Sequence, residues 1–397
     1  SYKRHPYKIH YRMGIKGDKI HAIEVESIAD SGAYCSVTPW VTWRSTVQCC
    51  GPYDVAHVHC DTYGVYTNNV FTGAMRGFGA PQINFAIEQL IEMAAEKIGI
   101  SPVEMRRRNM LRQGSTTITG QVLSSHTVSL DQVFQETLRK IDYETKALAC
   151  SHGQCAEGSE ELYGIGLAMS YRGMSLGAEG MDFNSAIINM QFDGSILLIA
   201  AEELGVTRDQ IRYRQPSTSN IPDGGTTVAS RGTLLGGGAT VIAARELKKK
   251  IAHVLAPKLG CKPEEVRFCN GRIYGPTDDR SFTFEEAGRE MYLKQDYPYA
   301  FGVFKAPKVT WNEETGQGDA YFTWVYGCQA VELSVNKRTG KVKLLNMVAA
   351  HEVGKAINRE MLLGQFYGGM AMGAGYGLFE ELKIEDGKIK TLNFHTY

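Results

Sequence analysis

Three glycine-rich stretches of the sequence carry residue types that could bind an anionic ligand. The first is AMRGFGAPQ at 74–82, where glycines on both sides of Phe78 allow a positive φ and leave backbone N–H groups just ahead of a helix. Arg76 adds a guanidinium suited to a phosphate or oxo group, and Phe78 offers a ring face to a planar substrate. The alternative is a tight strand-to-helix turn with Phe78 in the core.

The second stretch is DGGTTVASRGT at 223–233, followed by three glycines at 236–238. Small residues and hydroxyl groups ahead of a helix N-terminus suit a phosphate or a pterin. The stretch is not a Walker motif, since no Gly-Lys-Ser/Thr follows, and its glycines do not match GxGxxG after a strand. A plain solvent-exposed loop is the alternative.

The third stretch is GQFYGGMAMGAGYGL at 364–378, which precedes Glu380 and Glu381. Each glycine in an exposed helix costs about 1 kcal/mol relative to alanine, so we expect either another helix or a ligand to pack closely against it. The histidines show no HxxxH or HExxH spacing, and GxSxG is absent. The sequence therefore predicts neither a metal site built from protein side chains nor a nucleophile elbow.

Local patterns predict the elements that must position these stretches. Alternation over 5–35 indicates two strands that turn at Gly17-Asp18, and the apolar face over 83–98 indicates a helix ending at Gly99. Further helices are predicted at 239–255 and after Ser101, Ser129 and Thr283, and further hairpins at 193–194, 339–340 and 386–387. Strands and helices come in blocks, so we expect an α+β fold with two mixed α/β domains, in which helices pack on antiparallel sheets. The unpatterned segment 143–162 divides them into 1–150 and 151–397.

Composition restricts the class of protein. The 43 basic residues balance 43 acidic ones across 397 residues, which argues against nucleic acid or an anionic membrane as a partner. No apolar run is long enough to span a membrane. The nine cysteines include no CxxC pair, so we expect free thiols and a cytoplasmic protein, with neither a zinc ribbon nor an iron–sulfur run in this chain.

Taken together, AMRGFGAPQ, DGGTTVASRG, GQFYGGMAMGAGYGL and HEVGKAIN at 351–358 resemble the molybdenum-binding subunit of the xanthine dehydrogenase and aldehyde oxidase family. RHPYKIHYRMG at 4–14, ISPVEMRRRNM at 100–110 and SYRGMSLGAEG at 170–180 extend the resemblance along the chain in family order. It implies an oxidoreductase, a molybdenum hydroxylase of purine metabolism that adds oxygen from water to a purine carbon beside a ring nitrogen. Its cofactor would be molybdenum-molybdopterin, in the cytosine dinucleotide form, with metal ligands from the pterin and solvent.

The resemblance assigns roles to individual residues. Arg76 and the backbone of 77–80 would lie near the molybdenum ligands, Phe78 beside the substrate ring, and Arg44 where it orients a purine. A surface arginine is the alternative for Arg44. The implied cofactor-binding residues are Arg76, Gly77, Phe78, Gly79, Ala80, Val228, Ala229, Ser230, Arg231, Gly232, Met372 and Gly373. The pterin site would lie at the interface of the two domains, with residues 172–180 along the pocket.

The resemblance also implies parts that this sequence does not contain. The family's catalytic base is a glutamate, expected beyond Tyr397, and the N-terminal third of the subunit is expected ahead of Ser1. A strand at 196–200 runs into a helix at 201–205 without a turn, so about 20 residues with a Gly-Gln-Gly loop are expected to be missing between Ile199 and Glu202. Electrons would pass to 2Fe-2S and FAD groups on partner subunits or domains, in a complex expected to be a homodimer.

Two other functions stay open from the sequence. A hydroxylase of another N-heterocycle, such as nicotinate, or of an aldehyde would need no purine-orienting arginine. A pterin-binding or assembly module would bind molybdopterin without chemistry of its own.

Overall fold

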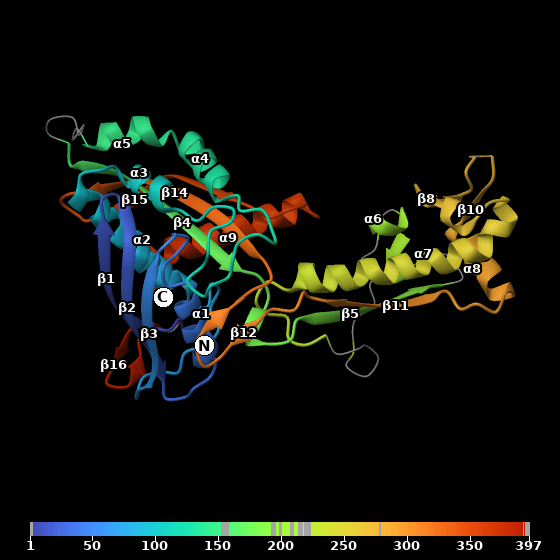
Figure 1. Ribbon diagram of the computed structural model, residues 1–397, viewed down its shortest axis with the longest axis horizontal. Coiled ribbons are helices and arrows are strands. Elements are labelled where there is room, and N and C mark those ends of the chain that lie inside the picture. Colours follow the sequence, from blue (N-terminus) through green and yellow to red (C-terminus); the bar gives the residue numbers. More distant parts are fainter. Residues whose placement is uncertain are drawn as a thin grey trace. The chain divides into compact units, whose positions relative to one another are not determined.

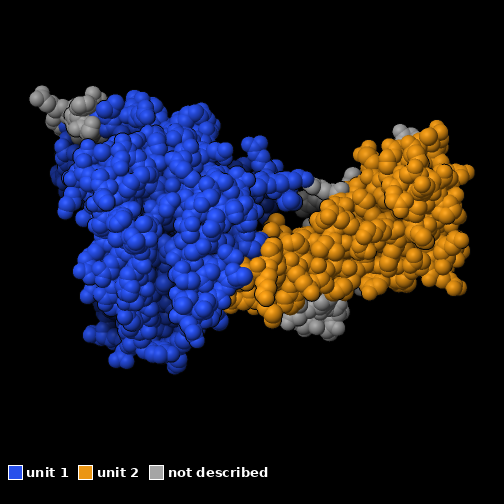
Figure 2. All heavy atoms as spheres, in the orientation of Figure 1, with its two compact units in different colours: residues 1–173, 310–397 blue, residues 174–309 orange. Residues whose placement is uncertain are grey.

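The computed structural model describes residues 3–151, 159–191, 196–197, 201–206, 210–212, 217, 224–277, 279–391 and 393. The chain forms two compact units, shown in Figure 2: unit 1 contains residues 1–173 and 310–397, and unit 2 contains residues 174–309. The predicted α+β class is confirmed, because each unit combines helices with mainly antiparallel sheets. The units differ from the predicted ranges, since the chain leaves unit 1 only after residue 173 and returns to it at 310.

The first sheet of unit 1 contains β1 (Tyr7–Lys16), β2 (Lys19–Gly32) and β3 (His57–Tyr66) (Figure 1). β1 and β2 form the predicted hairpin, whereas β3 lies parallel to β2. Helix α1 (Thr38–Val47) connects β2 to β3. Helix α2 (Ala80–Ile98) follows the first glycine-rich stretch and ends at Gly99 in a left-handed cap, as predicted.

The second sheet of unit 1 is antiparallel, with β14 (Trp324–Asn336) between β4 (Glu161–Gly173) and β15 (Val342–His351). Helix α4 (Leu130–Ile141) packs on β14 and β15. Of the two serine caps expected here, Ser101 accepts a hydrogen bond from the Glu104 N–H at the start of α3 (Pro102–Asn109), but Ser129 makes no cap bond to α4. The remaining elements of unit 1 are α5 (Tyr143–Ser151), β12 (Trp311–Asn312), β13 (Gln317–Gly318), α9 (Arg359–Leu378) and the predicted hairpin β16 (Ile384–Glu385) and β17 (Lys388–Ile389).

Unit 2 is built on helix α7 (Gly237–Leu259), which packs on β5 (Phe183–Met190) and β11 (Tyr299–Lys305). This helix was predicted at 239–255, and Leu247, Ile251 and Leu255 on its core side are fully buried. Helix α8 (Phe284–Leu293) begins with the predicted capping box. The other elements are β6 (Ile196–Leu197), α6 (Ala201–Leu204), β7 (Ile211–Arg212), β8 (Arg267–Cys269), β9 (Arg272–Tyr274) and β10 (Ser281–Thr283).

Four further expectations concern a turn, a gap in the chain, the thiols and the membrane. The predicted turn at 193–194 and the predicted gap after Ile199 lie outside the described residues. The cysteine side chains that the structure describes are free thiols, as expected. Among the described residues, no helix has the length and apolar character needed to cross a membrane.

A buried cluster of charges joins α2, α3 and β4. Arg106 on α3 is completely buried and donates to Glu88 Oε2 from Nε at 3.0 Å and from Nη2 at 2.8 Å. It also donates to Glu92 at 2.6 Å and to the Leu167 carbonyl at 2.9 Å, while the Tyr53 hydroxyl donates to Glu88 at 2.6 Å. A buried ion pair is costly to break, because the remaining partner is left as an uncompensated charge.

We therefore expect Arg106→Met to lower the free energy of unfolding by about 3–5 kcal/mol, since Glu88 would stay buried without its cation. Urea denaturation measures this change. The matched control is Arg12→Met on β1, whose exposed guanidinium pairs with Glu24 at 2.7 Å and should contribute less than about 1 kcal/mol. Equal losses in the two variants would contradict the role given to the buried cluster.

His5, just ahead of β1, generates a pH-dependent prediction. Burial lowers its pKa to about 4, and its Nε2 lies 2.9 Å from the Thr38 hydroxyl. The folded state therefore resists a proton that the unfolded chain takes up near pH 6.5, so stability is complete above pH 6.5 and falls as the pH drops toward 4. Between pH 7 and pH 5 we expect a loss of about 2 kcal/mol that His5→Gln does not show. Identical pH dependence of the two unfolding free energies would refute this assignment.

Candidate functional site

The loop at 75–79 has a left-handed backbone at three consecutive residues. φ is 102° at Gly77, 53° at Phe78 and 92° at Gly79. At Gly79 an added Cβ would lie 2.4 Å from the Val41 carbonyl oxygen of α1, so a side chain does not fit there. The positive φ expected from the sequence is present, and the loop lies directly on α1 before α2 begins at Ala80.

Arg76 extends from this loop to the glycine-rich helix α9. Its Nη2 donates to the Gln365 carbonyl at 2.9 Å and to the Gln365 side-chain oxygen at 3.3 Å. A Cβ at Gly368 or Gly369 would lie 3.5 or 3.6 Å from the guanidinium, which is ordinary van der Waals contact, so Arg76 lies directly against the helix here. Two of the three predicted stretches are therefore neighbours within unit 1.

Most glycines of α9 face open space. None of the residues of this helix is buried, and a Cβ at Gly364, Gly373, Gly375 or Gly377 would meet no described atom within 4 Å. The close contacts of α9 in the described part of the chain come from side chains rather than from another helix: Arg76 lies at 368–369, Arg4 over the Tyr376 ring and His351 against Phe366. Met372, predicted with Gly373 to line the cofactor, is 37% exposed on this open stretch.

Arg44 and Phe78 lie against each other. Arg44 is buried on α1, which excludes the surface alternative considered from the sequence. Its Cζ lies 5.4 Å from the centre of the Phe78 ring and 5.7 Å from that of Tyr321, which is cation–π distance to both rings. Phe78 is half-buried, so it is not enclosed in the core. With Met75 and Gln82 it lines a crevice too narrow to hold a water molecule.

Gln82 and Arg172 complete the surroundings of the loop. Gln82, 4% exposed in the first turn of α2, donates from Nε2 to the His5 carbonyl at 3.0 Å, and its buried Oε1 has no hydrogen-bond partner among the described residues. Such an orphaned acceptor costs about 1–3 kcal/mol, and a water molecule or a ligand can supply its donor. Arg172 donates to the Gly77 carbonyl. Gln82 was not among the site residues predicted from the sequence. A polar residue beside the apolar Ile83 at the start of a helix could have singled it out.

The second glycine-rich stretch lies in unit 2, ahead of a helical turn at 232–236 that continues into α7. Ala229 and Ser230 have φ of 55° and 59°, and the Ala229 carbonyl accepts from the Ser175 N–H at 2.9 Å. The Arg231 guanidinium is buried and donates to the Phe183 carbonyl at 2.6 Å and the Thr226 carbonyl at 3.2 Å. Arg231 therefore holds the turn, and Ser230 is exposed. Convergence of this stretch with the other two stays a prediction.

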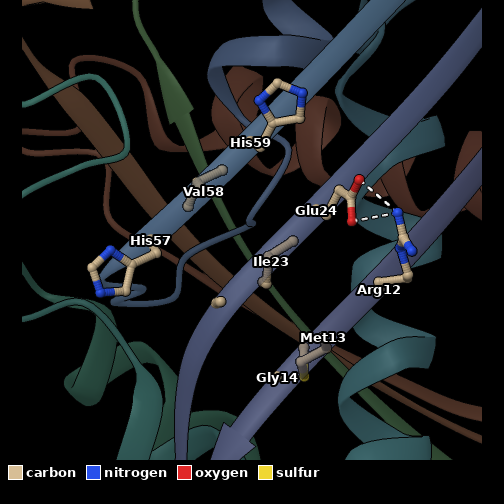
Figure 3. Close-up of a pocket in the computed structure, with 9 residues that line it drawn as sticks. Arg12, Met13, Gly14, Ile23, Glu24, His57, Val58 and His59 are labelled. Atoms are coloured by element: carbon tan, nitrogen blue, oxygen red, sulfur yellow. Dashed lines mark hydrogen bonds and ion pairs between the residues drawn. The ribbon is translucent and has the colours of Figure 1, made fainter.

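A hollow of about 480 Å³ lies elsewhere, on the outer face of the sheet formed by β1, β2 and β3. His57 and His59 of β3 line it, and Arg12 already pairs with Glu24 beside them, as Figure 3 shows. No predicted site residue contributes to this hollow. Among the described residues no group of histidine, cysteine and carboxylate side chains is arranged to hold a metal ion.

Comparison with known proteins relates these features to a family. A family model described as molybdopterin cofactor-binding domain matches residues 196–397, and a second model with the same description matches residues 1–110. A Bacillus subtilis protein named as a probable subunit of xanthine dehydrogenase is 28% identical over all of this chain and 53% of its own length. The nicotinate dehydrogenase large molybdopterin subunit of Eubacterium barkeri is 40% identical over 35% of this chain and 33% of that protein.

A solved structure is similar over nearly the whole chain. The aldehyde oxidoreductase of Desulfovibrio desulfuricans aligns with a TM-score of 0.80 and 28% identity, over 94% of this chain and 40% of the other. The chain thus spans about half the length, or less, of the proteins it matches. The loop at 75–79 lies in one matched range and α9 in the other, and Arg76 joins them. The chain belongs to the family of molybdopterin cofactor-binding domains.

Proposed function

We propose that this chain is the molybdopterin-binding part of a molybdenum hydroxylase, an oxidoreductase that adds oxygen from water to a carbon of its substrate. The observation that carries the proposal is the contact between Arg76 and Gln365, which brings the first glycine-rich loop against the glycine-rich helix. Each belongs to a separate range matched by a molybdopterin cofactor-binding model. A left-handed loop on a helix with open glycines is a surface that a flat ligand can approach closely.

The residues of the chain fit such a cofactor. Gln82 Oε1 is a buried acceptor without a partner in the described part of the chain, and the N–H groups of a pterin are donors of the matching kind. The backbone of 77–80 and the open stretch at Met372 and Gly373 would lie along the cofactor, and the exposed Ser230 turn would bind its phosphate. When bound, the cofactor supplies the molybdenum centre that accepts two electrons from the substrate. The cytosine dinucleotide form is the one we propose.

For the substrate, we propose a purine such as xanthine, with Phe78 against the ring. Phe78 is half-buried, and the Arg44 guanidinium lies at cation–π distance from its ring. A positive charge at this place would favour negative charge developing on a purine during attack. The Bacillus relative carries a xanthine dehydrogenase name, which supports this choice.

A nicotinate or aldehyde substrate is the second candidate, and the same arginine provides the observation that favours it. Arg44 is 2% exposed and lies between two aromatic rings, so its guanidinium contacts protein rather than open space. The 40% local identity to a nicotinate dehydrogenase subunit and the match to an aldehyde oxidoreductase are consistent with this alternative. For either substrate, we propose that electrons leave through 2Fe-2S and FAD groups on partner subunits or domains of a homodimeric, cytoplasmic complex.

The cofactor assignment predicts how two glycine substitutions at opposite ends of α2 will differ. Gly79→Ala places a Cβ 2.4 Å from the Val41 carbonyl oxygen and must displace the loop, so we expect the molybdenum content per chain to fall severalfold. Gly99→Ala is the control, because Gly99 has a left-handed φ of 73° but open space around its Cβ position. It should cost about 1 kcal/mol of stability and leave the metal content unchanged. Elemental analysis of the full-length protein measures the molybdenum content per chain. Equal molybdenum content in both variants would refute the cofactor assignment.

The substrate assignment predicts a change in specificity on removing Arg44. In Arg44→Ala we expect kcat/KM for xanthine to fall about a hundredfold more than kcat/KM for nicotinate or an aldehyde. Taking the ratio of substrates within one variant cancels any loss of folded enzyme. A parallel fall for all substrates would favour the second candidate. A molybdenum-loaded protein that turns over none of them would instead identify a non-catalytic binding module.

A further inference from the structure

The N-terminal segment, defined here as residues 3–5, lies alongside the loop at 75–79. Lys3 forms a parallel bridge with Thr72, and the Gly73 N–H donates to the Lys3 carbonyl at 3.1 Å. The His5 carbonyl accepts from Gln82 at 3.0 Å on the other side of the loop. The loop is therefore bracketed by backbone contacts to this segment at both of its ends.

Between these contacts, Arg4 connects the loop to α9. Its Nη1 donates to the Arg76 carbonyl at 3.0 Å, while Nε and Nη2 donate to the two carboxylate oxygens of Glu380 at 3.0 and 3.4 Å. Its Cζ also lies 4.5 Å from the centre of the Tyr376 ring. The side chain of Arg4 is 7% exposed and that of Glu380 13%, so solvent screens this pair weakly.

Two arginines thus hold one residue of the loop against two places on the same helix. The Arg76 side chain binds Gln365 near the start of α9, and the Arg76 carbonyl binds Arg4, which stacks on Tyr376 near the end. These two helix positions are roughly 16 Å apart along the axis. A loop tied at two separated points on a helix cannot rotate about either contact alone, so its left-handed backbone keeps one orientation toward α9.

We propose that Arg4 is a positioning residue that fixes the loop at 75–79 against α9 in the arrangement that receives the molybdopterin cofactor. The planar guanidinium is needed because it donates to a carbonyl and a carboxylate in different directions at once, which the compact ammonium of lysine does not reproduce. The ligand named here rests on the proposed function. The clamp, by which we mean the contacts of Arg4 with the Arg76 carbonyl, Glu380 and Tyr376, rests on unit 1 alone.

The test compares Arg4→Ala, Arg4→Lys and Glu380→Gln in the full-length protein with two controls, Arg12→Ala and Glu24→Gln. The control pair is also an arginine and a glutamate 2.7 Å apart, but it is exposed on the outer face of the first sheet. One readout is amide hydrogen exchange of residues 74–80. The other is the rate at which bound molybdopterin is lost on dilution, followed by the fluorescence of the oxidised pterin and by molybdenum content.

We expect Arg4→Ala and Glu380→Gln to speed loop exchange and cofactor loss about tenfold, as removal of a charge-assisted hydrogen bond would, and Arg4→Lys to give an intermediate effect. The controls should match the wild type. If Arg4→Lys and Glu380→Gln lower the melting temperature but leave both rates at control values, the role of Arg4 is merely structural and the proposal fails. If Arg4→Ala does not fold, the rates measured for Arg4→Lys and Glu380→Gln test the proposal.

Failure of the proposed function would look different. A wild-type protein that retains no molybdopterin would contradict the cofactor assignment, and exchange at 74–80 would then test the clamp by itself. Unchanged loop exchange in the Arg4 and Glu380 variants overturns the clamp whether or not cofactor is present.

Discussion

The buried guanidinium of Arg106 is the interaction on which unit 1 depends. It is fully enclosed and uses its donors on Glu88, Glu92 and the Leu167 carbonyl, so α2, α3 and β4 must meet in one arrangement for the charge to be compensated. Apolar contacts would tolerate small shifts of these elements, whereas a buried ion pair does not. The first glycine-rich loop leads directly into α2, and it therefore starts from a fixed helix.

The loop itself could not keep its shape from local forces. Gly77 and Gly79 adopt positive φ freely, but the left-handed backbone of Phe78 between them is strained, and it persists only where its surroundings hold it. Here α1 lies against Gly79, Arg172 binds the Gly77 carbonyl, and α9 receives the Arg76 side chain. Strain held in this way is typical of a site that must present backbone atoms to a ligand without rearranging.

Glycine is dense in α9, where Arg76 lies against Gly368 and Gly369. The helix backbone at Gly373, Gly375 and Gly377 is not covered by any described atom. An uncovered helix backbone and an orphaned acceptor at Gln82 are both compatible with a family that binds molybdopterin. The Arg44 guanidinium makes a separate contact, with the rings of Phe78 and Tyr321.

Local sequence determined the elements: the hairpin at Gly17-Asp18, the cap at Ser101 and the helix ending at Gly99 depend on residues a few positions apart. Its glycine pattern also indicated the positive φ at 77–79. Tertiary structure decided the rest. Ser129 does not make the expected cap bond, and Arg44 is buried. Residues 310–397 belong to the same unit as residues 1–173. Arg4 and Glu380 are 376 positions apart, and no periodicity connects them. Such contacts exist only once the sheets and helices have packed, since burial and partner choice depend on neighbours distant in the chain.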